Sequence, residues 1–130
     1  THTDAVKTLL DKYEITDPVV DTTLGEFQNQ NFEDLYTSLV DKGGQSLVEA
    51  LIVGATVEDL DINDLNELTA RTDNQDIITV YDNLNKGSRN HLRTFIQQIE
   101  NNGGTYEPKY ISQSEFDEII SSEPERGSVR

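Results

Sequence analysis

The chain of 130 residues is long enough for one compact domain, and its composition does not shift along the sequence to suggest a second. Acidic side chains outnumber basic ones by 25 to 10, so nucleic acids and anionic membranes are poor partners for this surface. The absence of cysteine excludes disulfides and thiolate metal sites. The formal net charge of -15 would attract metal cations, although an acidic, solvated surface is its simpler explanation.

The first predicted helix begins at the very start of the chain. Apolar residues follow the helical i, i+3, i+4 spacing from His2 to Tyr13. No capping residue precedes this pattern, so we expect the chain to begin inside a helix, with an N-terminal part removed. Thr16, Asp17 and Pro18 end the helix, and the stretch as far as Gln30 has no sustained period. The sequence therefore predicts a long connection before the next helix.

A short second helix and two long helices follow. Asn31 caps the short helix, which Gly43 and Gly44 end. Ser46 and Glu49 form an S-x-x-E capping box at the head of a long helix that runs to about residue 71. The next long helix runs from about residue 76 to 102. Because only a tight break separates these two helices, we expect them to pack antiparallel.

The last predicted helix is short and begins at a second capping box, formed by Ser112 and Glu115. Together these patterns predict an all-α antiparallel helical bundle over residues 1–121, followed by a polar, disordered tail at 122–130. No apolar run approaches the roughly 20 residues needed to span a bilayer, and no signal segment opens the chain. The compartment stays undetermined.

Three ionisable residues fall on the apolar stripes of the predicted helices. At about 100° per residue, Glu58 lies in the middle of the stripe of its long helix, and His91 lies on the stripe of the next. His2 shares the apolar face of the first helix. Asp61 borders the Glu58 stripe, and Ser88 lies one turn before His91. A buried carboxylate needs a partner, so these residues are the candidate site.

The lengths of the helices place these residues at one level. Counting equal numbers of residues in both directions from the turn near residue 73, Glu58 should face the helical turn between Ser88 and His91. His2 should lie at the same level along the bundle as His91. Two imidazoles and a carboxylate are a plausible set of ligands for iron, manganese or zinc. The alternative is a buried polar network satisfied by hydrogen bonds. We favour the metal site because three such residues share one level.

Three other residue patterns do not indicate a functional site. Asp59, Asp61 and Asn63 imitate the start of a calcium loop, but the required glycine is absent, and we interpret them as an exposed acidic helix face. Ser88 and His91 lack an orienting acid and an oxyanion hole, so this pattern does not favour a hydrolase and no catalytic residue is assigned. Two arginines four residues apart are interpreted as a solvated face that could also pair with acidic neighbours, and these are Arg89 and Arg93.

The chain resembles a ferritin-like family of uncharacterised bacterial and archaeal proteins, long described as a domain of unknown function. Four segments carry the resemblance, and they are THTDAVKTLLDKY (1–13), SLVEALIVGATVEDLDINDL (46–65), DNQDIITVYDNLNKGSRNHLRTF (73–95) and GTYEPKYIS (104–112). The resemblance implies a ferritin-like bundle that lacks its first helix here, and a Glu-x-x-His motif of which His2 is the histidine. The ferritin-like superfamily builds a dinuclear site from glutamates and histidines on four helices.

Carried over to this sequence, the resemblance implies that His2, Glu58 and His91 are metal ligands, with Asp61 and Ser88 around them. Ser88 stands where the fourth helix should supply a glutamate, so one bridging carboxylate is missing and oxidative di-iron chemistry is in doubt. We therefore expect iron, manganese or zinc as a single ion, or none in this fragment.

Two functions remain open. The first is a metal-binding protein for iron handling or di-metal oxidation, and the second is a non-enzymatic helical module with a buried polar network. An apolar groove left by a missing helix predicts a homo-oligomer.

Overall fold

The structure is a computed structural model that describes residues 1–127. Within this range the secondary structure is entirely helical, which confirms the predicted all-α class. The five helices are α1 (His2–Lys12), α2 (Gln30–Gly43), α3 (Leu47–Ala70), α4 (Gln75–Asn101) and α5 (Gln113–Ser121). The predicted long connection lies between α1 and α2.

The helix boundaries follow from side-chain caps. The Ser46 hydroxyl accepts the Glu49 N–H at 3.1 Å at the start of α3, and the Ser112 hydroxyl accepts the Glu115 N–H at 3.1 Å at the start of α5. The serine half of each predicted capping box is therefore confirmed. The glutamates face elsewhere, since Glu49 lies 3.6 Å from the Lys42 ammonium and Glu115 accepts a hydrogen bond from an asparagine of α3.

The expectation that α1 starts without a cap was wrong. The Thr1 hydroxyl accepts the Asp4 N–H at 3.2 Å, and the Asp4 carboxylate accepts hydrogen bonds from the Thr1 hydroxyl and amino group. This reciprocal pair satisfies donors that the first turn of a helix leaves unpaired. The apolar spacing that predicted the helix did not reveal this cap, because Thr1 and Asp4 are both polar.

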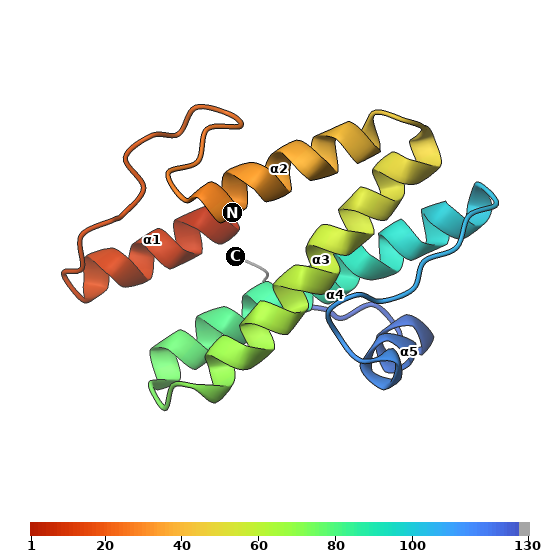
Figure 1. The fold of residues 1–130 in the computed structure, drawn as a ribbon. Coiled ribbons are helices and arrows are strands. Elements are labelled where there is room, and N and C mark those ends of the chain that lie inside the picture. The colour runs from red at the N-terminus through yellow and green to blue at the C-terminus, as the bar shows by residue number, and fades with distance from the viewer. Residues whose placement is uncertain (128–130) are drawn as a thin grey trace.

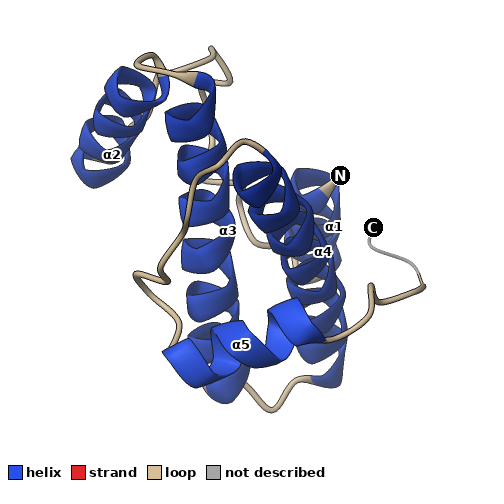
Figure 2. Cartoon of the chain, turned by 90° about the vertical axis from the view of Figure 1, so that its right-hand side faces the viewer, coloured by secondary structure: helices blue, strands red, loops and turns tan. Residues whose placement is uncertain are grey.

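An antiparallel hairpin of α3 and α4 is the centre of the molecule (Figure 1). Gly54 allows close contact within it, because a Cβ at this position would lie 2.4 Å from the Phe95 ring. In Figure 2, α2 lies beyond α3 and α1 lies behind α4, so these two helices occupy opposite sides of the hairpin. The short helix α5 crosses the hairpin at a steep angle (Figure 2).

The apolar core lies between the hairpin, α5 and the segment that leads into α5. Its fully buried side chains include Ile62 of α3, and Leu92 and Ile99 of α4. Phe116 and Ile119 of α5 cover one side of this core. In contrast, α1 and α2 contribute no buried residue. The candidate site lies on the side of the hairpin that α1 approaches.

No helix within residues 1–127 is both long enough and apolar enough to cross a bilayer. Part of the segment expected to be a disordered tail, residues 122–127, is described by the structure, and there Glu125 is hydrogen-bonded to α4. The rest of that expected tail, residues 128–130, lies outside the described residues.

Candidate functional site

Glu58 and His91 meet across the hairpin. The Glu58 Oε1 atom lies 3.2 Å from the His91 Nδ1 atom, as the antiparallel register of α3 and α4 predicts. Only 14% of the Glu58 side chain is exposed, whereas 58% of the His91 side chain is exposed. Our expectation that the three site residues all point into the bundle core was therefore wrong for His91, which lies at its edge because α1 covers it only on one side.

His2 joins this pair from α1. Its ring stacks on the His91 ring with centroids 6.3 Å apart and planes 28° from parallel. Because His2 is half-buried, the stack closes one side of the Glu58–His91 contact. The structure thus brings together the three residues selected from the sequence, which come from α1, α3 and α4. Their role as metal ligands stays a prediction.

Two buried oxygens at this contact are not hydrogen-bonded. The Glu58 Oε2 atom and the Ser88 Oγ atom are both buried without a partner. Ser88 is fully buried on α4 and lies close enough to Glu58 to lower its pKa, although the two oxygens do not meet hydrogen-bond geometry. Unpaired buried polar atoms are costly and uncommon in native proteins, so they mark a site where a partner is expected.

Burial dominates the electrostatics of both carboxylates at the site. It raises the pKa of Glu58, and the neighbouring His91 offsets part of this rise. It also raises the pKa of Asp61, and His2 is the largest opposing influence on that carboxyl group. His2 and His91 both lower the pKa of Asp61, so this carboxylate is within electrostatic reach of the two imidazoles. A cation bound here would stabilise the ionised forms that burial disfavours.

The donor atoms fit a transition-metal ion in kind but not in spacing. Imidazole and carboxylate are ligands that iron, manganese and zinc accept. However, the described residues include no group of three or more His, Cys, Asp or Glu side chains close enough together to hold a metal ion. Glu58 is hydrogen-bonded to His91, and the stacked rings of His2 and His91 present their faces to each other. As these side chains are placed, they do not form a complete set of ligands.

Sequence reasoning misjudged the carboxylate next to Glu58. Asp59 was expected on an exposed acidic face, but its side chain is completely buried. It accepts hydrogen bonds from the Tyr106 hydroxyl at 2.7 Å and from the backbone N–H groups of Lys109 at 2.6 Å and Ile111 at 2.8 Å. The Tyr110 N–H also approaches it at 3.2 Å. Asp59 therefore holds the segment before α5 against the opposite face of α3.

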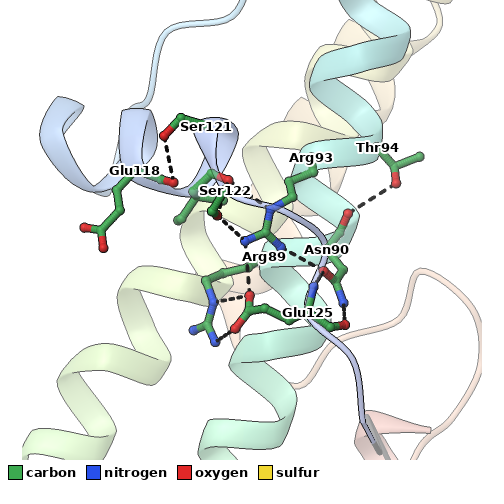
Figure 3. A network of polar contacts seen from close by, with 9 residues as sticks. Arg89, Asn90, Arg93, Thr94, Glu118, Ser121, Ser122 and Glu125 are labelled. Atoms are coloured by element: carbon green, nitrogen blue, oxygen red, sulfur yellow. Dashed lines mark hydrogen bonds and ion pairs between the residues drawn. The ribbon is translucent and has the colours of Figure 1, made fainter.

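The arginines expected on a solvated face are paired with the C-terminal segment (Figure 3). Arg89 donates two hydrogen bonds to the Glu125 carboxylate, at 2.8 Å from Nε and 2.6 Å from Nη2. Arg93 donates a third to Glu125 at 3.2 Å and another to the Ile119 carbonyl at 2.9 Å. The favoured interpretation was wrong because the acidic partner lies over thirty residues away in sequence. This network is satisfied and leaves little capacity for an external anion.

Comparison with known proteins places the chain in a family. A family model described as "Uncharacterized protein domain (DUF2202)" matches residues 1–123. The chain belongs to this family. A relative, the uncharacterized protein MJ0754 of Methanocaldococcus jannaschii, is 57% identical over 130 residues, which are 100% of this chain and 70% of the relative.

The fold of this DUF2202 chain is similar to an experimental structure. The crystal structure of hypothetical protein MJ0754 from Methanococcus jannaschii matches it with a TM-score of 0.93 at 56% identity. The match covers 95% of this chain and 71% of that chain. These likenesses establish the family and the helical fold.

Proposed function

We propose that this protein binds a single transition-metal ion, with Glu58, His91 and His2 as ligands. The observation that carries the proposal is the 3.2 Å contact between Glu58 and His91, with the second Glu58 oxygen buried and unpaired. A largely buried carboxylate with one unpaired oxygen, beside two imidazoles, has the donor chemistry that iron, manganese and zinc require. The neighbouring Asp61 and Ser88 would orient the ligands and offset the charge of the ion.

The proposal places the protein in the iron-handling or oxidoreductase class that its ferritin-like resemblance implies. A dinuclear site needs bridging carboxylates, and Ser88 stands where one is expected. We therefore propose one ion rather than two for this chain. Bound iron or manganese would supply redox chemistry and zinc would supply a Lewis acid, while Glu58 and the imidazoles hold the ion and set its accessibility.

Self-association is part of the same proposal. A groove of about 610 Å³ runs between α1 and the connection that follows it, lined in part by Val6, Leu10, Pro18 and Val19. Exposed apolar side chains also continue along this connection, with Leu24 the most exposed of them. Exposed apolar surface of this kind is typical of contacts between protein chains, and we propose that a second copy covers it. Light scattering should give a mass above that of one chain, and a monomer mass would contradict this.

A second candidate function is a non-enzymatic helical module held by buried polar groups. The Asp59 network favours it, as does a chain of hydrogen bonds in which Asn85 donates to Asn66 at 2.8 Å and Asn66 donates to Glu115 at 2.8 Å. In this alternative, the Glu58–His91 contact is one more structural hydrogen bond. The alternative predicts that metal affinity does not depend on Glu58.

Metal titration separates the two functions. We expect isothermal titration of the metal-free protein with zinc chloride to give one site per chain, and Glu58→Ala to weaken binding at least about tenfold. Glu67→Ala is the matched control, because Glu67 is an exposed carboxylate on the same helix. Equal affinities of wild type and Glu58→Ala would show that zinc binds only to the acidic surface, which would overturn the metal-site proposal.

A further inference from the structure

The segment that follows α5, residues 122–127, is held on α4 through Glu125 (Figure 3). We call this segment the strap. Glu125 is half-buried, whereas the other residues of the strap are exposed. Because no apolar side chain of the strap is buried, polar contacts of one residue provide most of its attachment, and a segment held in this way opens at low cost in free energy.

Asn90 binds the main chain of Glu125 with both ends of its side-chain amide. The Asn90 Nδ2 atom donates to the Glu125 carbonyl at 2.9 Å, and the Glu125 N–H donates to the Asn90 Oδ1 atom at 2.9 Å. Arg93 donates to the same Oδ1 atom at 2.8 Å and so fixes the orientation of the amide. Since the N–H and C=O groups of one residue point the same way in extended chain, this paired contact selects an extended segment.

The two arginines bind the side chain of the same residue. Arg89 donates to the two oxygens of the Glu125 carboxylate at 2.8 Å and 2.6 Å, and Arg93 adds a contact at 3.2 Å. The hydrogen bonds from Arg89 lower the pKa of Glu125, so the ionised form is bound. A guanidinium group that binds both oxygens matches the planar shape of a carboxylate. Main chain and side chain of one glutamate are therefore both recognised.

The charges around this contact favour a single carboxylate over a polyanion. Three of the ten basic residues of the chain lie on one face of α4, at three- and four-residue spacing, and these are Lys86, Arg89 and Arg93. A cavity of about 440 Å³ beside the arginines is also lined by carboxylates, which belong to Glu115, Glu118 and Glu123. These carboxylates repel a nucleic acid or another polyanion, whereas one glutamate in a peptide can reach the arginines between them.

Arg89 and Arg93 differ in what they do besides binding Glu125. Arg93 also donates to the Ile119 carbonyl at 2.9 Å and to the Ser122 hydroxyl at 2.8 Å, so it ties the end of α5 to α4. Within residues 1–127, the Arg89 side chain donates to Glu125 alone. Opening of the strap beyond Ser122 would therefore leave α5 in place and present the Arg89 guanidinium and the Asn90 amide to another ligand.

We propose that Arg89, Asn90 and Arg93 form a binding site for a glutamate in an extended segment of a partner protein, and that the strap occupies this site until the partner displaces it. The strap is attached to α5, so its effective concentration at the site exceeds that of a free partner, and the site is closed in the isolated protein. This site shares no residue with the proposed metal site, so the two proposals stand independently.

Peptide binding to the full chain with Glu125→Ala tests the site. The probe is a fluorescein-labelled peptide SEPERG, which has the sequence of residues 122–127. Fluorescence anisotropy should show that it binds Glu125→Ala at least about tenfold more tightly than wild type, because the competing carboxylate of the strap is gone. Glu123→Ala is the matched control, since it removes an exposed carboxylate of the same strap and should bind the peptide as weakly as wild type.

Removal of the guanidinium group tests how the peptide is held. The double variant Glu125→Ala, Arg89→Ala should bind the peptide at least about tenfold more weakly than Glu125→Ala. The peptide SEPARG, in which alanine replaces the second glutamate, should not compete. In NMR spectra of Glu125→Ala, the Arg89 Nε–H resonance should move back toward its wild-type position when SEPERG is added. The amide resonances of the α3–α4 hairpin should stay in place, because the strap contributes no buried apolar side chain.

Three results would overturn the peptide site. One is equal affinity of SEPERG for wild type and Glu125→Ala, and another is binding to Glu125→Ala that does not depend on Arg89. The third is inorganic phosphate that binds Glu125→Ala more tightly than the peptide does, which would identify a plain anion site. Because these titrations contain no zinc, their failure would leave the metal-site proposal untouched.

Discussion

Two adjacent carboxylates on α3 have opposite environments. Asp59 is completely buried and accepts hydrogen bonds from a tyrosine hydroxyl and backbone N–H groups. Glu58 faces the other way, toward α1, and keeps one buried oxygen unpaired beside His91. A satisfied buried carboxylate organises the fold, whereas an unsatisfied one beside imidazoles is available to a ligand. The α5 side of the hairpin is thus structural, and the α1 side is the candidate for function.

Asp59→Asn should give the largest effect of the variants that test this difference between Asp59 and Glu58. An amide in place of the carboxylate turns one acceptor into a donor that faces other donors, so we expect a loss of more than about 3 kcal/mol in the free energy of unfolding. Urea denaturation measures it. Asp64→Asn, at an exposed carboxylate on the same helix, should change stability by less than about 0.5 kcal/mol. Similar values for the two variants would mean that Asp59 does not organise the fold.

The rigidity of the hairpin that separates the two sides is tested by Gly54→Ala. The added methyl carbon would lie 2.4 Å from the Phe95 ring, so we expect a loss of about 2 kcal/mol although alanine favours helix. Thermal unfolding should show the loss, and Phe95→Leu in the same chain should recover part of it. A stabilised Gly54→Ala variant would show that the helices separate easily there.

Removing a single donor from Asp59 gives a smaller effect. Tyr106→Phe deletes the hydroxyl that lies 2.7 Å from the carboxylate, while three backbone N–H groups remain. We expect a loss of about 1 kcal/mol in urea denaturation, and faster hydrogen exchange in the segment 104–111. Unchanged exchange in that segment would contradict the role of Asp59 as its anchor.

Ionisation of Glu58 should make the stability of the metal-free protein depend on pH. Burial raises its pKa, so ionisation of Glu58 disfavours the folded state as the pH rises above the ordinary carboxyl range. Glu58→Gln removes this ionisation and should stabilise the metal-free protein near pH 7 by less than about 1 kcal/mol, with no gain near pH 4. Urea denaturation at both pH values measures it, and a clear loss of stability near pH 7 would place Glu58 with Asp59 as a structural group.

Local signals predicted much of this fold. The serine caps at Ser46 and Ser112 fixed the starts of α3 and α5, and the turn between the long helices predicted their antiparallel register. That register was enough to pair Glu58 with His91. It could not show that His91 is exposed, because the position of α1 decides its burial.

The contacts of Asp59 and Glu125 could not be predicted in the same way. The donors to Asp59 come from an irregular segment about fifty residues further along, and no periodic pattern marks such a segment. Glu125 likewise reaches Arg89 from a polar stretch beyond the last helix. Helix periodicity describes the face of α3 that meets α4, and it carries no information on which loop covers the remaining face.

The central claim is that Glu58, His91 and His2 bind one metal ion, and anomalous scattering from crystals grown with zinc chloride tests it most directly. The account predicts a peak at the zinc edge within about 2.1 Å of ligand atoms from Glu58 and His91, with the His2 ring turned toward it. Zinc found only on exposed carboxylates, with the Glu58–His91 contact unchanged, would contradict it.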